Sequence, residues 1–282
     1  MPAPARVLVN GAPADCVSAF DRGLSYGDGL FETMRFIGAD APLWHRHMQR
    51  LQASCQRLRL PSPDAAGLLG EARDVIAGLP QSVVRLTLTR GIGTRGYTPP
   101  PVPQPTRIVA GFALPSLSAD DYVRGLRVRR CHLQLAEQPS LAGMKHLNRL
   151  EQVLARAEWN DPAIGEGLLC DSLGRVISAT MANLFAVIDD VLVTPALERC
   201  GIAGVARAEI LAIRPQAQVR DVKWEELARA SELFLCSGVR GVLPVRELDG
   251  RACAIGPVTR ALQQHWHSLG FSMENVSMGQ AG

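Results

Sequence analysis

The sequence contains only two side chains that could act as a primary amine. Of its 30 basic residues, Lys145 and Lys223 are the lysines and the others are arginines. An unprotonated amine can form an imine with a carbonyl compound or transfer a proton. Lys145 lies at the junction of an irregular segment and a helix-like segment, from which it can project into a cleft. Lys223 adjoins two glutamates and is typical of a solvated surface. A lone lysine is more often structural than catalytic, so the residue type alone does not assign this role.

Two glycine-containing segments have the features of an anion site. The segment 200–207 (CGIAGVAR) runs into a predicted helix, where backbone N–H groups and the positive end of the helix dipole can face an anion. The segment 235–241 (LCSGVRG) is a strand that ends in a Ser-Gly turn. Neither segment has the spacing of a nucleotide-binding motif, and each by itself is only weak evidence for an anion site. A third segment, 21–33 (DRGLSYGDGLFET), must turn tightly at its glycines, which a surface turn would also explain.

Composition excludes several classes of function. The net charge of +3 gives no strong field for nucleic acid or an anionic membrane. No apolar run approaches the roughly 20 residues that span a bilayer, and the N-terminus shows no secretory signal. The seven cysteines form no CxxC or Cys/His cluster, so we expect neither a metal site nor disulfides. Cys170 and Cys236 lie in apolar runs and are predicted to fill a core. These features indicate a reduced, cytoplasmic protein.

The elements that position these residues alternate between helices and strands. The periodicity predicts helices at 45–60, 147–159 and 257–269, and strands at 6–10, 82–90, 107–114, 126–133, 167–171, 176–177, 184–193 and 232–237. A loop rich in Gly and Pro lies between the strands 82–90 and 107–114; it is either functional or flexible filler. A polar Pro/Ser-rich stretch predicts two domains, at 1–114 and 123–282, joined by a linker at 115–122.

Taken in order, these segments resemble the fold-type IV pyridoxal-phosphate enzymes, which include branched-chain and D-amino-acid aminotransferases and 4-amino-4-deoxychorismate lyases. The resemblance spans essentially the whole chain through DRGLSYGDGLFET, HMQRL, GMKHLNRLEQVLAR, SATMANLF and CGIAGVAR. The lysine segment, RGIGTRGY and the length below 300 residues look more like the lyases. The resemblance implies a mixed α/β fold of two domains, with a smaller N-terminal α/β domain and a larger C-terminal pseudo-barrel domain.

The resemblance also implies roles for particular residues. Lys145 would form the imine with pyridoxal 5'-phosphate and act as general acid and base. Arg50 would bind the cofactor phosphate, although a solvated helix face would equally explain this arginine. The other implied cofactor-binding residues are Val205, Ala206, Ser237 and Gly238 at the phosphate and Ser178 at the ring nitrogen. Tyr26, Arg90, Arg95 and Tyr97 would bind the substrate.

Ser178 is the point at which the chain departs from the family pattern, because most members have a glutamate there. A serine hydroxyl cannot stabilise a protonated ring nitrogen as a carboxylate does. This departure argues against a transaminase, and the resemblance to the lyases implies an enzyme that converts 4-amino-4-deoxychorismate to 4-aminobenzoate and pyruvate in folate biosynthesis. The alternatives are a branched-chain or D-amino-acid transaminase, a non-catalytic cofactor-binding protein, or an α/β domain without a cofactor. The resemblance further implies a homodimer that acts on a small molecule.

Overall fold

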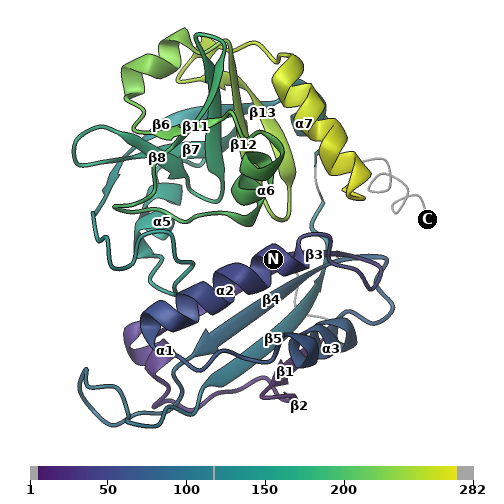
Figure 1. Cartoon of the computed structure of the whole chain (residues 1–282), viewed down its shortest axis with the longest axis vertical. Coiled ribbons are helices and arrows are strands. Elements are labelled where there is room, and N and C mark those ends of the chain that lie inside the picture. The colour runs from purple at the N-terminus through teal and green to yellow at the C-terminus, as the bar shows by residue number, and fades with distance from the viewer. Residues whose placement is uncertain (1–5, 117, 272–282) are drawn as a thin grey trace. The chain divides into compact units, whose positions relative to one another are not determined.

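The computed structural model describes residues 6–116 and 118–271. The chain divides into two compact units. Unit 1 comprises Met1–Pro115 together with Met144–Asn148, and unit 2 comprises Ser116–Gly143 and Arg149–Gly282. The first boundary lies next to the expected end of the N-terminal domain at residue 114. Figure 1 shows the elements of both units.

Unit 1 is built on an antiparallel sheet of five strands in the order β2-β1-β5-β4-β3. Its elements are β1 (Arg6–Val9), β2 (Ala12–Pro13), α1 (Arg22–Tyr26), β3 (Gly29–Ile37), α2 (Trp44–Leu58), α3 (Ala65–Val75), β4 (Gln81–Thr89) and β5 (Thr106–Ala113). Strands β1 and β2 are joined by Asn10 and Gly11, both with positive φ, as their residue types predict. The predicted helix 45–60 and the predicted strands of this region are present within a few residues of their expected bounds.

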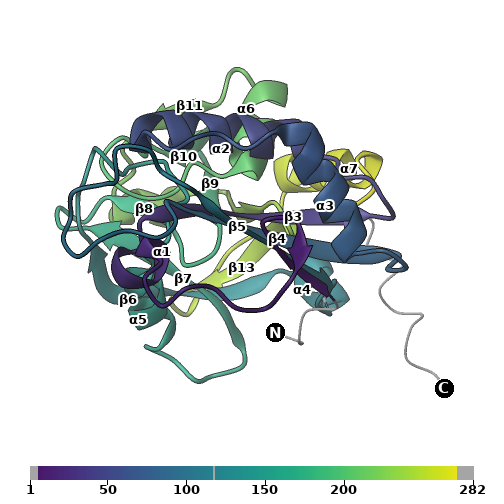
Figure 2. The ribbon, with the colours of Figure 1, turned by 90° about the horizontal axis from the view of Figure 1, so that it is seen from below.

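Helices α2 and α3 cover the same face of this sheet (Figure 2). Side chains alternate between the two faces of β3, so Glu32 and Met34 point toward the helices while Phe31 points to the opposite face. Gly111 of β5 lies on the helix-covered face, where a Cβ atom would be 2.2 Å from the carbonyl oxygen of Val75 in α3. The absence of a side chain at Gly111 therefore allows α3 to approach the sheet closely.

The segment Met144–Asn148 belongs to unit 1, although the sequence suggested that it lies in the C-terminal domain. The Phe31 N–H donates to the carbonyl of Lys145 at 2.9 Å, and the Leu147 N–H donates to that of Gly29 at 3.0 Å. The segment thus adds an extended stretch to the free edge of β3. For this reason the predicted helix 147–159 begins only at Leu150, and it ends at Arg156 to form α5 (Leu150–Arg156).

Unit 2 contains a second, larger sheet. Its elements are α4 (Ala119–Arg124), β6 (Leu126–Leu135), α5, β7 (Ile164–Asp171), β8 (Val176–Ala179), β9 (Asn183–Ile188), β10 (Val191–Pro195), α6 (Val205–Ile213), β11 (Gln218–Arg220), the 3-10 helix η1 (Trp224–Arg229), β12 (Glu232–Ser237), β13 (Gly241–Leu248), β14 (Arg251–Ala252) and α7 (Pro257–Ser268). The strand order is β11-β10-β9-β12-β13-β6-β7-β8, with β14 paired to β13. Because β8 also contacts β9 and β10, the sheet curls back toward itself.

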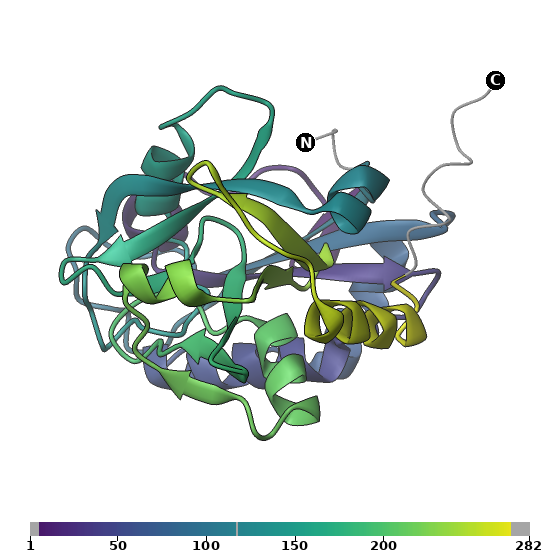
Figure 3. The ribbon, with the colours of Figure 1, turned by 90° about the horizontal axis from the view of Figure 1, so that it is seen from above.

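The core of unit 2 is formed by side chains from the inner face of this curled sheet. It includes Leu168, Cys170, Leu184 and Leu235, each almost fully buried. Cys236 is also buried, as its apolar surroundings in the sequence predicted. All seven cysteines are free thiols. Helices α4 and α7 pack against β13 (Figure 3). Helix α4 begins inside the stretch 115–122 that the composition suggested as a linker, because the Ser118 side chain caps its N-terminus.

Candidate active site

Lys145 is positioned by the pairing of its segment with β3. Lys145 lies opposite Phe31 in this pairing, and both side chains point to the face of the sheet that carries no helix. The Nζ atom lies 4.0 Å from the centroid of the Phe31 ring. The Lys145 side chain is partly exposed, whereas Lys223 is exposed at the N-terminus of η1, in agreement with the sequence prediction. The ammonium group of Lys145 is therefore held against a ring face and stays accessible.

Arg85, which the sequence motifs did not identify, lies on the same helix-free face of the sheet as Phe31 and Lys145. It lies on β4 directly opposite Thr33, and its Cζ atom lies 4.6 Å from the centroid of the same Phe31 ring. Burial lowers the pKa of the Arg85 guanidinium. Within residues 6–116 and 118–271, Arg85 has no hydrogen bond or ion pair with a carboxylate. The signal that could have identified it is a charged side chain within the apolar, alternating strand SVVRLTLTR.

Arg50, the predicted phosphate-binding residue, is held by a buried carboxylate. Its Nε atom donates to Oε1 of Glu32 at 2.8 Å, and its Nη2 atom donates to Oε2. The Nδ1 atom of His47 lies 2.7 Å from the same Oε2 atom. Burial alone would raise the pKa of Glu32, but the charge of Arg50 and the hydrogen bond from His47 lower it to about 2. Glu32 is therefore ionised, and it fixes the orientation of the Arg50 guanidinium.

His47 is neutral in this cluster. Burial lowers its pKa below the ordinary value of 6.5, and this effect outweighs the opposing influence of Glu32. An ionised carboxylate only accepts hydrogen bonds, so the Nδ1 atom of His47 carries the proton. Glu32 and His47 could not be identified from the sequence, because nothing in local periodicity pairs residues of β3 with residues of α2.

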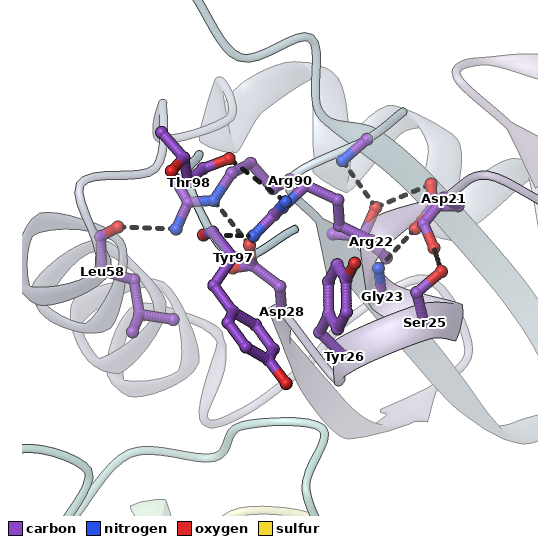
Figure 4. A network of polar contacts seen from close by, with 12 residues as sticks. Asp21, Arg22, Gly23, Ser25, Tyr26, Asp28, Leu58, Arg90, Tyr97 and Thr98 are labelled. Atoms are coloured by element: carbon purple, nitrogen blue, oxygen red, sulfur yellow. Dashed lines mark hydrogen bonds and ion pairs between the residues drawn. The ribbon is translucent and has the colours of Figure 1, made fainter. Parts of the chain in front are cut away.

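Arg90, one of the predicted substrate residues, forms three hydrogen bonds within unit 1 (Figure 4). It donates to Oδ2 of Asp28 at 2.8 Å and to the carbonyls of Arg59 and Leu58 at the end of α2. Arg22 donates to the same Asp28 oxygen at 2.9 Å. Burial by itself would raise the pKa of Asp28, but these two arginines lower it. Arg90 joins β4 to the end of α2, and this geometry argues for a structural role.

The other predicted substrate residues lie on or beside the loop that follows β4. The hydroxyl of Tyr26 accepts a hydrogen bond from the Gly96 N–H at 3.1 Å, and the Tyr26 and Tyr97 rings lie side by side with centroids 5.4 Å apart (Figure 4). Tyr97 is 86% exposed, and Arg95 is exposed as well. The loop is ordered by Arg22, which donates to the carbonyls of Gly96 and Tyr97. The structure thus brings Tyr26 and Tyr97 together and leaves Arg95 at the surface.

The predicted phosphate-binding residues of unit 2 come from two segments that the sheet brings together. Val205 and Ala206 are the first residues of α6, whose N-cap is Gly204, and no described side chain caps their N–H groups. Ser237 ends β12, and its hydroxyl accepts a hydrogen bond from the Arg240 N–H at 3.1 Å. Strand β12 pairs with β9, the strand that begins at Asn183, and the Asn183 side chain bonds to the Gly204 amide. We call the α6 N-terminus and the turn 237–241 the cup.

Arg207, in the first turn of α6, is a buried cation that pairs with no carboxylate of the described residues. Its Nε atom donates to the Thr194 hydroxyl at 3.2 Å, and its Nη2 atom donates to the carbonyl of Pro195 at 3.0 Å. Both acceptors are neutral, and Arg207 forms no ion pair with any described residue. Burial accordingly lowers its pKa. A buried cation at the positive end of a helix dipole is unfavourable unless an anion binds nearby.

Ser178, the predicted partner of a ring nitrogen, is buried on β8 opposite Leu169 of β7. Two residues further on, the Thr180 hydroxyl donates to Glu166, a fully buried carboxylate that also accepts from Nη2 of Arg240 at 2.8 Å. The carboxylate of Glu166 is thus paired with an arginine. Unit 2 therefore offers a hydroxyl at the position where the family pattern has a glutamate.

Two further kinds of site are not found among the described residues. No group of His, Cys, Asp and Glu side chains there could hold a metal ion. No helix of the described part is both long enough and apolar enough to cross a membrane.

Comparisons with known proteins identify relatives over most of the chain. The sequence model of the family described as "Amino-transferase class IV" matches residues 29–248. An aminodeoxychorismate lyase of Vibrio harveyi is 34% identical over 263 residues, which are 90% of this chain and 97% of that protein. The crystal structure of 4-amino-4-deoxychorismate lyase from Pseudomonas aeruginosa superposes with a TM-score of 0.89 and 45% identity, over 93% of this chain and 98% of that one. A branched-chain amino acid aminotransferase of Escherichia coli superposes with a TM-score of 0.85 and 25% identity, over 98% of both chains.

Proposed function

The chain belongs to the class IV aminotransferase family, and on this premise we propose that it is a pyridoxal-phosphate-dependent lyase. Its reaction converts 4-amino-4-deoxychorismate to 4-aminobenzoate and pyruvate, a step of folate biosynthesis. The two relatives named for this activity are more similar to the chain than the aminotransferase is, at 34% and 45% identity against 25%. These similarities support the lyase over the transaminase.

The observation that carries the proposal is the arrangement around the Phe31 ring. The Lys145 ammonium and the Arg85 guanidinium both lie against this ring, at 4.0 and 4.6 Å from its centroid. One face of unit 1 therefore carries an amine and a partly buried guanidinium, and the guanidinium pairs with no carboxylate of the described residues. A substrate that carries both an amino group and carboxylates needs these two groups, because a guanidinium binds a carboxylate through two parallel hydrogen bonds.

The residues of the chain fit pyridoxal 5'-phosphate. Lys145 would supply the amine that binds the aldehyde carbon, and Ser178 would supply a hydroxyl for the ring nitrogen. Arg50, the amides of Val205 and Ala206, and the turn at Ser237 and Gly238 would hold the phosphate. Arg207 makes the cup electropositive without touching a carboxylate, which supports binding of a dianion. When bound, the cofactor withdraws electrons from the substrate carbon that carries the nitrogen.

Lys145 then performs the proton transfers. The Nζ atom, as a neutral amine, would act as the base that removes the proton from C4 of the substrate. The electrons of that C–H bond form a ring double bond as the adjacent C–O bond breaks, and enolpyruvate leaves as the ring becomes aromatic. The proton on Nζ is delivered to the methylene carbon of enolpyruvate, which yields pyruvate. The Phe31 ring, in contact with Nζ, keeps the amine in place through both transfers.

Ser178 favours this elimination over a transamination. A transaminase moves a proton between two carbons and relies on a ring nitrogen that stays protonated, for which a carboxylate partner is suited. The Glu166 carboxylate is paired with Arg240 instead. An elimination driven by forming an aromatic ring requires less electron withdrawal from the cofactor. The hydroxyl of Ser178 is sufficient for such a reaction.

The test combines spectroscopy with product measurement. Purified protein with pyridoxal phosphate should show a visible imine absorbance, and adding aminodeoxychorismate should release pyruvate without any 2-oxo acid acceptor. Lys145→Ala should lose both signals, whereas the matched variant Lys223→Ala should keep both. Amino transfer from an amino acid to a 2-oxo acid, with no pyruvate from aminodeoxychorismate, would establish the transaminase instead. An absorbing protein that turns over neither substrate would establish a binding protein.

We also propose a homodimer, which the resemblance implies and an exposed apolar stripe supports. Leu150, Val153 and Leu154 of α5 are 76%, 60% and 60% exposed, and their spacing puts them on one side of the helix. Such a stripe is unfavourable in water and is typical of an interface. The double variant Val153→Glu/Leu154→Glu should sediment as a monomer, and Leu173→Glu, at an isolated exposed leucine, should remain a dimer. A monomeric wild type would contradict this proposal.

A further inference from the structure

Asn183, the first residue of β9, connects the two segments that form the cup. Its main chain pairs with Cys236 of β12, next to Ser237. Its side chain is buried and forms two hydrogen bonds to the loop that precedes α6. The Nδ2 atom donates to the carbonyl of Ile202 at 2.9 Å, and the Oδ1 atom accepts from the Gly204 N–H at 3.0 Å. One amide side chain thus ties the end of β12 to the start of α6.

The loop 201–204 is held on its other side by Gly143. The Gly143 N–H donates to the carbonyl of Gly201 at 2.9 Å, and the Ala203 N–H donates to the carbonyl of Gly143 at 3.0 Å. A Cβ atom at Gly204 would lie 2.1 Å from Oδ1 of Asn183, so the close contact requires a glycine at 204. The loop is therefore fixed from both sides, by Gly143 and by the Asn183 side chain. Gly143 precedes Lys145 by two residues along the chain.

This arrangement controls the direction of the free amides of α6. Gly204 is the N-cap of α6, and the orientation of its peptide sets the direction of the N–H groups of Val205 and Ala206. No described side chain caps these amides, so they are available to an anion. The buried charge of Arg207, without an ion pair among the described residues, is an independent indication that an anion binds here. Hydrogen bonds to an anion depend strongly on their angle, so the direction of the amides matters.

We propose that Asn183 is a positioning residue for the cofactor phosphate. Its side chain holds the loop 201–204 so that the first amides of α6 and the Ser237 turn point at a single phosphate group. The inference rests on the proposed function, because it identifies the anion of the cup as the phosphate of pyridoxal phosphate. Asn183 does not touch the phosphate in this scheme and acts through Gly204 and Ile202.

The test compares binding of pyridoxal phosphate with binding of pyridoxal, which lacks the phosphate. The full-length apoprotein is titrated with each compound, and imine formation is followed by absorbance. Leucine has a volume similar to that of asparagine but forms no side-chain hydrogen bonds. Asn183→Leu should therefore lower the preference for pyridoxal phosphate over pyridoxal by about tenfold or more, because the charge-assisted hydrogen bonds to the phosphate are misdirected. Affinity for pyridoxal itself should stay within about threefold of wild type, because Lys145 and the ring contacts are unchanged. Asn183→Ser, a milder change in case the leucine variant does not fold, should give an intermediate preference.

Thr259→Val is the matched control. Thr259 is fully buried in unit 2, and its hydroxyl donates to Glu232 at 2.6 Å, at the opposite end of β12 from Ser237. This variant loses a buried hydrogen bond and should leave the preference for the phosphate unchanged. An equal loss of affinity for both compounds in the Asn183 variants, or an unchanged preference, overturns the inference. A wild-type protein that forms an imine with neither compound overturns the proposed function itself, so the two failures are distinguishable.

Discussion

Replacing Glu32 with glutamine should destabilise the protein at neutral pH and make it less sensitive to acid. The side chain of Glu32 is buried and accepts hydrogen bonds from Arg50 and His47. Its pKa is lowered from 4.5 to about 2, which corresponds to roughly 3 kcal/mol at about 1.4 kcal/mol per pKa unit. A pKa lowered on folding gives stability that is fully present above the unfolded pKa of 4.5 and lost as the pH falls toward 2. Glutamine removes this contribution and leaves the buried Arg50 without its carboxylate.

The assay is urea unfolding of the wild type and Glu32→Gln, followed by far-UV circular dichroism between pH 7 and pH 3. The difference in unfolding free energy should be about 3 kcal/mol at pH 7 and less than half of that at pH 3. The control is Asp40→Asn, because Asp40 forms an exposed pair with Arg73 at 3.7 Å and should change stability by under about 0.5 kcal/mol. A difference for Glu32→Gln that is the same at both pH values would refute the assignment of an ionised, paired Glu32.

Two other substitutions test the site and the fold of unit 1. Arg85→Gln should raise the KM for aminodeoxychorismate by about tenfold to a hundredfold, because the proposed bidentate contact between this partly buried guanidinium and a substrate carboxylate is lost. The imine absorbance of Lys145 should be kept. An unchanged KM in steady-state assays would exclude Arg85 from substrate binding. Asp21→Ala should lower the unfolding free energy by roughly 3 kcal/mol, because the carboxylate caps α1 through the Gly23 N–H and accepts from the hydroxyls of Thr89 and Thr106. Thermal unfolding measures this effect, and a melting temperature within about 2 °C of wild type would contradict it.

Local features of the structure could be predicted from local sequence. The amphipathic spacing of 45–60 identified α2, and alternation identified β4 and β5. The pair Asn10-Gly11 predicted the turn between β1 and β2 because these residue types accept positive φ. Such patterns work because they report on interactions between residues a few positions apart. The helix around Leu147 was predicted too long for the same reason: the competing partner of that residue is Gly29, more than a hundred positions earlier.

The residues that surround the candidate catalytic groups could not be predicted in this way. Arg50 was identified from its motif, but the carboxylate that orients it comes from β3, 18 residues earlier. Arg90 resembled a substrate residue because it is an arginine near a glycine-rich loop. In the structure it donates hydrogen bonds to Asp28 and to two carbonyls at the end of α2. Residue type identifies a charge, and only the neighbours that the fold supplies determine whether that charge is neutralised.

The sequence by itself determined that one of two lysines must supply any imine-forming amine, and the motif around Lys145 selected between them. The tertiary structure decided where that amine lies, because hydrogen bonds to the edge of β3 put Lys145 against Phe31. It also decided that the Arg85 guanidinium lies against the same Phe31 ring, because the register of β3 with β4 brings these two residues, 54 positions apart, onto one face of the sheet. Sheet register is set by pairing between distant segments, and it has no counterpart in the spacing of residues along the chain.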